Sequence, residues 1–134
     1  MRRALAAAGA ALLLQGCGGS AGDVLAIEVT GGPLTAKQTL VVTADGRGSC
    51  NHGKLRAIPN AWLIDAQAVA HDAKPIAEAG AGYTAAGRTG ARQYLLRLPQ
   101  GNVRFTEERP GLPPALAHAQ LLALQLGRLL CGRA

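Results

Sequence analysis

The beginning of the 134-residue chain decides which residues can take part in its fold. Arg2 and Arg3 form a short positive segment, an uncharged apolar run covers residues 4–14, and small or neutral residues lead on to Cys17. This is the layout of a secretory signal. A helix over the apolar run spans roughly 16 Å, whereas a hydrocarbon core is about 30 Å thick, so the run is too short to cross a bilayer. We therefore predict a signal peptide over residues 1–16.

Residues 14–17, Leu-Gln-Gly-Cys, resemble the lipobox of bacterial lipoproteins. Gln15 differs from the small residue that is usual before Gly16. The resemblance implies cleavage between Gly16 and Cys17 and a diacylglycerol on the Cys17 thiol, and two or more acyl chains give stable anchoring. We expect a lipid anchor on the extracytoplasmic face of the cell membrane, in the periplasm or at the outer membrane of a diderm. An ordinary signal peptide with an incidental cysteine and an apolar helix of a soluble protein are the alternatives.

The part after the signal has the size of one domain. Residues 17–23 are rich in Gly and are predicted as a flexible tether, and residues 24–134 are predicted as a single folded domain. The whole chain has 14 basic and 8 acidic residues, a formal charge of +6, and loss of Arg2 and Arg3 leaves +4. The basic residues are scattered and only four residues are aromatic. Nucleic-acid binding, which favours a concentrated basic surface, is therefore not expected.

The remaining cysteines form an even pair once Cys17 carries lipid. Exported domains fold in an oxidising compartment, where such a pair usually forms a bridge. We predict a disulfide between Cys50 and Cys131, which closes about 80 residues and contributes roughly 4–5 kcal/mol in the chain-entropy model. Two buried free thiols are the alternative.

Hydrophobic periodicity predicts strands and helices in a definite order. Four segments have the alternation and β-branched content of strands: residues 24–30, 39–44, 92–98 and 103–106. Residues 46–53 are polar and are predicted as a loop that carries Cys50 and His52. Residues 80–87 are too rich in Gly for a confident strand, although Tyr83 can pair.

Two segments have helical periodicity. Residues 61–73 carry one apolar stripe, and Pro75 is expected to end this helix because it disfavours helical backbone at Lys74. Pro113 and Pro114 suit the first turn of a second helix, whose stripe of leucine and alanine runs to Cys131. The predicted fold is α+β, a small antiparallel sheet with two helices packed on one face.

No set of residues predicts catalysis or a metal site. Cys50 and His52 are two positions apart in a predicted loop, which is no catalytic geometry by itself, and the expected disulfide removes the nucleophile. His52, His71 and His118 are far apart in sequence, and a metal site needs a cluster of three or four ligands. We expect no catalytic residues, no cofactor and no metal, with exposed histidines as the default.

Two further patterns have ordinary explanations. Asp65 and Asp72 are seven residues apart and share one side of a helix, which we interpret as a solvated surface rather than a carboxylate pair. Residues 79–90 are rich in Gly but lack the Lys and the strand–helix context of a phosphate-binding loop.

The order of elements and four short motifs resemble the emfourin family of small bacterial proteins. The motifs are Thr30-Gly31-Gly32-Pro33, the strand with Tyr94, Val103-Arg104-Phe105, and Leu112-Pro113-Pro114-Ala115-Leu116. The resemblance covers residues 25–130, and a lipid anchor and a disulfide depart from the family pattern. It implies inhibition of thermolysin-like metallopeptidases by loops that occlude the active-site cleft.

The sequence thus favours a non-enzymatic, lipid-anchored binding or scaffolding domain of the cell envelope. Its expected partners are the membrane, through the N-terminal lipid, and an envelope protein. A peptidase inhibitor of emfourin type is the alternative, with a peptidase as partner.

Overall fold

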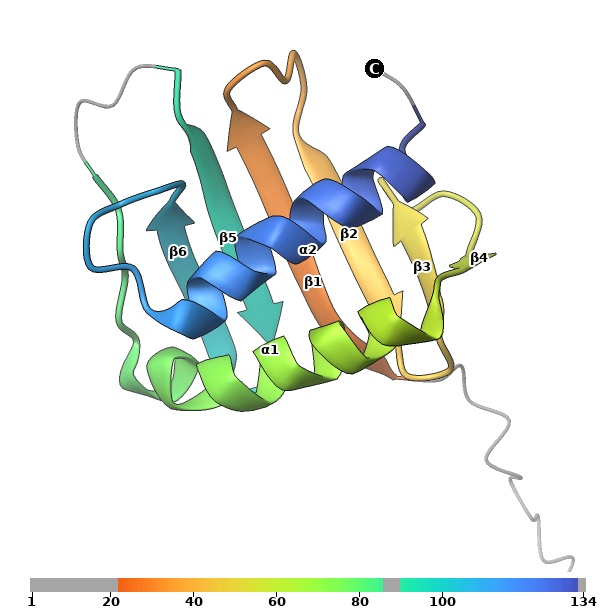
Figure 1. Ribbon diagram of the computed structural model, residues 1–134, viewed down its shortest axis with the longest axis horizontal. Coiled ribbons are helices and arrows are strands. Elements are labelled where there is room, and N and C mark those ends of the chain that lie inside the picture. The colour runs from red at the N-terminus through yellow and green to blue at the C-terminus, as the bar shows by residue number, and fades with distance from the viewer. Residues whose placement is uncertain (1–21, 86–89, 133–134) are drawn as a thin grey trace, which may run out of the picture.

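A computed structural model describes residues 22–85 and 90–132 of the chain. The described residues form these strands and helices: β1 (Asp23–Gly31), β2 (Gln38–Thr43), β3 (Arg47–Cys50), β4 (Arg56–Ala57), α1 (Asn60–Ala79), β5 (Arg92–Leu98), β6 (Gly101–Thr106) and α2 (Pro114–Leu130). All strand pairs between neighbours are antiparallel, in the order β4-β3-β2-β1-β5-β6 (Figure 1).

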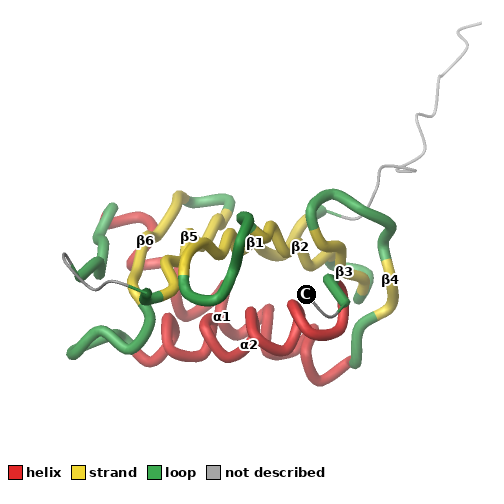
Figure 2. Tube along the Cα trace, turned by 90° about the horizontal axis from the view of Figure 1, so that it is seen from above, coloured by secondary structure: helices red, strands yellow, loops and turns green. Residues whose placement is uncertain are grey.

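The elements form two layers. Both helices lie on the same face of the sheet, and no helix of the described residues lies on the other face (Figure 2). The predicted α+β class, with an antiparallel sheet and two helices on one face, is confirmed. The helices reach this arrangement because each has an apolar stripe that leaves water only against the sheet and the other helix.

The core lies between the sheet and the helices. In the central strand β1, Ile27 is paired with Leu40 of β2 and Leu96 of β5, and all three side chains are fully buried. Leu122 and Leu126 of α2 are buried in the same cluster. Burying a leucine contributes about 1.5–3 kcal/mol, so this contact of α2 with the sheet is a main source of stability.

The loop expected over residues 46–53 is wrong in part, because β3 lies there. Gly48 and Ser49 are buried and pair with Val42 and Val41 of β2. A side chain at Gly48 would place its Cβ 2.8 Å from the Cδ1 atom of Leu130. Glycine therefore lets the end of α2 pack closely on the strand, and its low strand propensity concealed the strand.

The predicted end of the first helix before Pro75 is also wrong. Helix α1 continues to Ala79 and ends at Gly80, whose left-handed backbone lets its N–H and that of Ala81 bond carbonyl groups of the last turn. Pro75 is exposed, while Ala77 is buried and continues the apolar stripe beyond it. Packing of this last turn on the core outweighs the cost of proline inside the helix.

Candidate functional site

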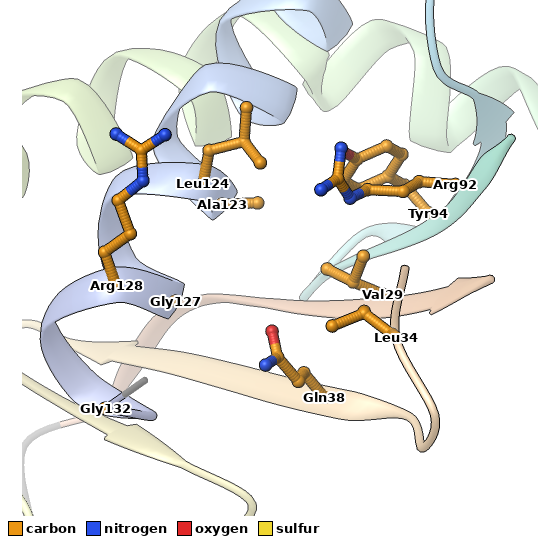
Figure 3. A pocket seen from close by; sticks show the side chains of 10 residues that line it. All are labelled: Val29, Leu34, Gln38, Arg92, Tyr94, Ala123, Leu124, Gly127, Arg128 and Gly132. Atoms are coloured by element: carbon orange, nitrogen blue, oxygen red, sulfur yellow. The ribbon is translucent and has the colours of Figure 1, made fainter. Parts of the chain in front are cut away.

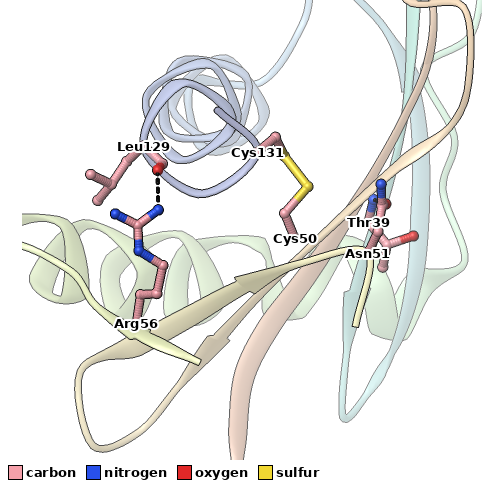
Figure 4. The surroundings of a disulfide bond; sticks show 6 residues. All are labelled: Thr39, Cys50, Asn51, Arg56, Leu129 and Cys131. Carbon is pink, nitrogen blue, oxygen red and sulfur yellow. Dashed lines mark hydrogen bonds between the residues drawn. A yellow bond between two sulfur atoms is a disulfide. The ribbon is translucent and has the colours of Figure 1, made fainter. Parts of the chain in front are cut away.

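The predicted disulfide is present and joins the end of β3 to the end of α2. Cys50 and Cys131 have their sulfur atoms 2.08 Å apart and their Cα atoms 5.3 Å apart (Figure 4). Beside the bridge, Nη1 of Arg56 donates a hydrogen bond of 3.0 Å to the carbonyl oxygen of Leu129. Since that carbonyl lies in the last turn of α2, the positive charge of the guanidinium also interacts favourably with the negative end of the helix dipole. The C-terminal end of α2 is thus held by a covalent bond and a charged hydrogen bond.

A pocket of about 510 Å³ opens on the side of α2 that faces β1, β2 and β5. It lies where β1 ends and where β2 and β5 begin, against the last two turns of α2 (Figure 3). Its apolar lining comes from four side chains: Val29, Leu34, Ala123 and Leu124. Small-ligand sites have volumes of about 300–1,000 Å³, so the pocket has the size of such a site.

Polar groups at this pocket come from three different elements. Gln38 opens β2, Arg92 opens β5 and Arg128 belongs to the last turn of α2. Nη1 of Arg92 is 3.3 Å from Oε2 of Glu107, which holds the guanidinium at the pocket. Arg128 is exposed, and no ion pair of the described residues includes it. The pocket therefore has two cationic side chains and no acidic one in its lining.

Tyr94 adds a hydroxyl group to the pocket. Its ring stacks on Phe105 with 4.9 Å between centroids, and the residue is only 2% exposed. The hydroxyl has no hydrogen-bond partner among the described residues. Burial raises the pKa of Tyr94 to about 12, so the phenol is protonated at neutral pH and is a donor there. A buried donor without a partner is costly, and a ligand oxygen would satisfy it.

The sequence did not predict this pocket. From the sequence, Arg92 is one of the scattered basic residues in a predicted strand, Tyr94 belongs to the same strand and to an emfourin-like motif, and Arg128 has no assigned role. Tyr94 of β5 and Arg128 of α2 line the same pocket because both elements pack on the same hydrophobic core. The one local signal is a tyrosine on the inward side of an apolar strand, which by itself indicates packing.

The residues considered for catalysis are not assembled into a site. The sulfur of Cys50 is bound to Cys131, so it is no nucleophile, and His52 lies exposed in the turn after β3. Nε2 of His118 is 3.4 Å from Oδ1 of Asp65, a contact between the two helices that sequence periodicity did not predict. His71 and Asp72 are exposed on α1. Within residues 22–85 and 90–132, no three His, Cys, Asp or Glu side chains cluster as metal ligands.

The glycine-rich segment over residues 79–90 is described in part. Gly80 ends α1, and Tyr83 pairs with Phe105 in an isolated parallel bridge, as the sequence allowed. The N–H of Ala85 donates to Oγ1 of Thr106 at 2.9 Å, so this part of the segment runs along the edge of the sheet at β6. Residues 86–89 lie outside the described part of the chain.

The predicted signal peptide, Gly16 and Cys17 lie outside the described residues. Within residues 22–85 and 90–132, no helix is both long enough and apolar enough to cross a bilayer. Comparison of the chain with protein-family models, curated proteins and solved structures finds no match. The resemblances to bacterial lipoproteins and to emfourins therefore stay predictions.

Proposed function

We propose that the protein is an exported lipoprotein that is held at the cell envelope by acyl chains on Cys17 and that binds a ligand or partner there without catalysing a reaction. The disulfide between Cys50 and Cys131 is the observation that carries this proposal. Structural disulfides persist in oxidising compartments and are rare in the cytosol. The bridge thus agrees with export, which is what the signal layout and the lipobox of residues 14–17 predict from the other end of the chain.

The chemistry of the pocket supports binding rather than catalysis. Its polar groups are the guanidinium groups of Arg92 and Arg128, the amide of Gln38 and the phenol of Tyr94. Guanidinium and amide groups keep the same protonation state near neutral pH, so they are poor general acids and bases. Because burial raises the pKa of Tyr94 to about 12, its phenol donates a hydrogen bond but is a poor general base. These four groups can hold and orient a ligand.

Labelling with a radioactive or clickable palmitate tests the anchor. The full chain, expressed in a bacterium, should incorporate the label and sediment with membranes. Cys17→Ser should abolish both, because the acylated thiol is gone. The matched control is the double variant Cys50→Ser/Cys131→Ser, which should still incorporate the label. Membrane retention of the Cys17→Ser chain after a carbonate wash would contradict the lipoprotein proposal.

A peptidase inhibitor of emfourin type is the second candidate. The observation in its favour is the order of the later elements, in which the hairpin of β5 and β6 comes before the final helix α2, although four strands rather than two precede α1. An exposed loop at residues 51–55 and a partly exposed one at residues 107–111 are available for insertion into a cleft. The mature chain with Cys17→Ser should then slow a thermolysin-like metallopeptidase at a stoichiometric amount. No slowing at several-fold excess removes this candidate and leaves the lipoprotein proposal standing.

A further inference from the structure

We infer that the pocket between α2 and the ends of β1, β2 and β5 binds a small carboxylate with an apolar tail. This inference rests on the proposed binding role of the domain and names the ligand class of its pocket. It does not depend on the lipid anchor. Three features carry it: apolar side chains in the lining, the guanidinium groups of Arg92 and Arg128, and a buried hydroxyl without a partner among the described residues.

The interior of the pocket suits an apolar group. Val29 and Leu34 line it from the sheet side, and Ala123 and Leu124 line it from α2 (Figure 3). A pocket of about 510 Å³ has room for a tail of several carbon atoms. Each buried methylene strengthens binding by about fourfold at most, so tail length should control affinity. A small inorganic anion would leave this surface uncovered.

The charges at the pocket favour a ligand with a single negative charge. Arg92 and Arg128 contribute two positive charges, and Glu107, which is bound to Arg92, contributes one negative charge. Of the two guanidinium groups, that of Arg128 has no ion pair among the described residues, and the charge of Glu108 also acts on Tyr94 from outside the lining. A guanidinium has five N–H donors in a planar fork that matches a carboxylate, and the Glu107 contact uses Nη1. A monovalent planar carboxylate therefore fits better than a divalent phosphate.

The hydroxyl of Tyr94 gives the site a fixed donor. The group is buried, points to the pocket beside Arg92 in Figure 3 and has no partner among the described residues. One carboxylate oxygen can accept its hydrogen bond while the other lies at Arg92. The ligand would thus satisfy a polar group that the empty pocket leaves unsatisfied. Stacking on Phe105 holds the ring in place before the ligand arrives.

Octanoate is a suitable probe, with octanol and acetate as matched controls. The mature chain from residue 17 carries Cys17→Ser, so that no acyl chain of its own can fill the pocket. Titration followed by nuclear magnetic resonance of the backbone amides should show saturable shifts at Val29, Gly127 and Gly132. Octanol lacks the charge and acetate lacks the tail, so each should bind about tenfold more weakly or worse.

Variants separate the pocket from general effects of charge. Arg128→Gln should weaken octanoate binding about tenfold, because it replaces the cation with a shorter, neutral amide side chain. Tyr94→Phe should weaken it by a similar factor while the fold stays intact. Arg104→Gln is the control, since Arg104 is exposed on the opposite face of the sheet, and it should bind octanoate like the unmodified chain.

Two results would overturn the inference. One is the absence of saturable shifts with octanoate up to about 10 mM, a concentration at which even a weak site would fill. The other is equal weakening by Arg104→Gln and Arg128→Gln, which would indicate attraction by overall charge. Either result would leave palmitate labelling at Cys17 unchanged, so failure of the pocket is distinguishable from failure of the lipoprotein proposal.

Discussion

The hydroxyl of Tyr94 should reduce the stability of the protein when no ligand is bound. It is buried without a partner among the described residues, and such a group costs about 1–3 kcal/mol. Tyr94→Phe keeps the stacked ring against Phe105 and should raise the free energy of unfolding by about 1 kcal/mol. Urea unfolding followed by the fluorescence of Trp62 measures the change. Tyr83→Phe, at a half-buried tyrosine, is the control and should change stability little, and a lower stability of Tyr94→Phe would contradict the prediction.

Glu28 makes the stability of the folded protein depend on pH in the acidic range. Its carboxylate accepts a hydrogen bond of 3.0 Å from Arg97 and lies 3.3 Å from Nζ of Lys37, and the Arg97 hydrogen bond is the main cause that lowers the pKa of Glu28. A carboxyl whose pKa is lowered on folding stabilises the folded state above its unfolded pKa, near 4.3, and loses this contribution as the pH falls through the folded pKa.

The pH dependence of unfolding tests this contribution. Glu28→Gln should lower stability at pH 7 by less than about 1 kcal/mol, because Arg97 and Lys37 are more than half exposed. The difference from the unmodified chain should shrink between pH 5 and pH 3. Glu78→Gln removes an exposed carboxylate 3.9 Å from Lys74 and is the control. A difference that grows in acid would show that the assigned sign is wrong.

At the scale of elements, α2 should be the helix on which stability depends most. Leu126 is fully buried in the core, whereas Leu121 on the same helix is 55% exposed. Leu126→Ala should lower the free energy of unfolding by about 2–5 kcal/mol, since it removes buried carbon and leaves a cavity. Leu121→Ala makes the same chemical change on the outer side and should stay within about 0.5 kcal/mol. Urea unfolding compares the two, and similar losses would contradict the packing of α2.

Elements with a strong apolar stripe were predictable from the sequence. The apolar residues from Leu116 to Leu126 are spaced so that a helix places them on one face. This spacing predicted α2, because only one face of a helix can pack on the sheet. Pro75 misled the prediction for α1, since a local preference for ending the helix competed with burial of Ala77 two residues later. β3 was missed because Gly48 is present for close packing against Leu130 rather than for strand propensity. Local propensity fails where tertiary contacts decide.

The pocket was not predictable for a related reason. Gln38, Arg92 and Arg128 come from separate elements, and no spacing along the chain indicates that they meet. Their approach depends on the strand order, in which β5 pairs with β1, a strand far from it in the sequence, as well as with β6. The disulfide was predictable, because it follows from the number of cysteines and the compartment rather than from the positions of side chains.

At the scale of the whole molecule, the disulfide links the core and the pocket. Cys131 directly follows α2, and Arg128 and Gly132 of the pocket lie within three residues of it. The bond from Cys50 therefore holds the same end of α2 that lines the pocket. Two further contacts hold this end of α2. Arg56 donates a hydrogen bond to the carbonyl of Leu129, and Leu130 packs closely on Gly48. Opening the bridge should affect global stability and the pocket together.

The double variant Cys50→Ser/Cys131→Ser tests this coupling. The bridge joins positions 81 residues apart, so its loss should lower the free energy of unfolding by about 4–5 kcal/mol through the larger entropy of the unfolded chain. Urea unfolding measures this loss against the Cys17→Ser chain, which keeps the bridge. In the folded fraction, the amides of Gly127 and Gly132 should also exchange with deuterium faster, because α2 frays once its end is free. Unchanged exchange at these amides would mean that Arg56 and the packing around Gly48 hold the helix end without the covalent bond.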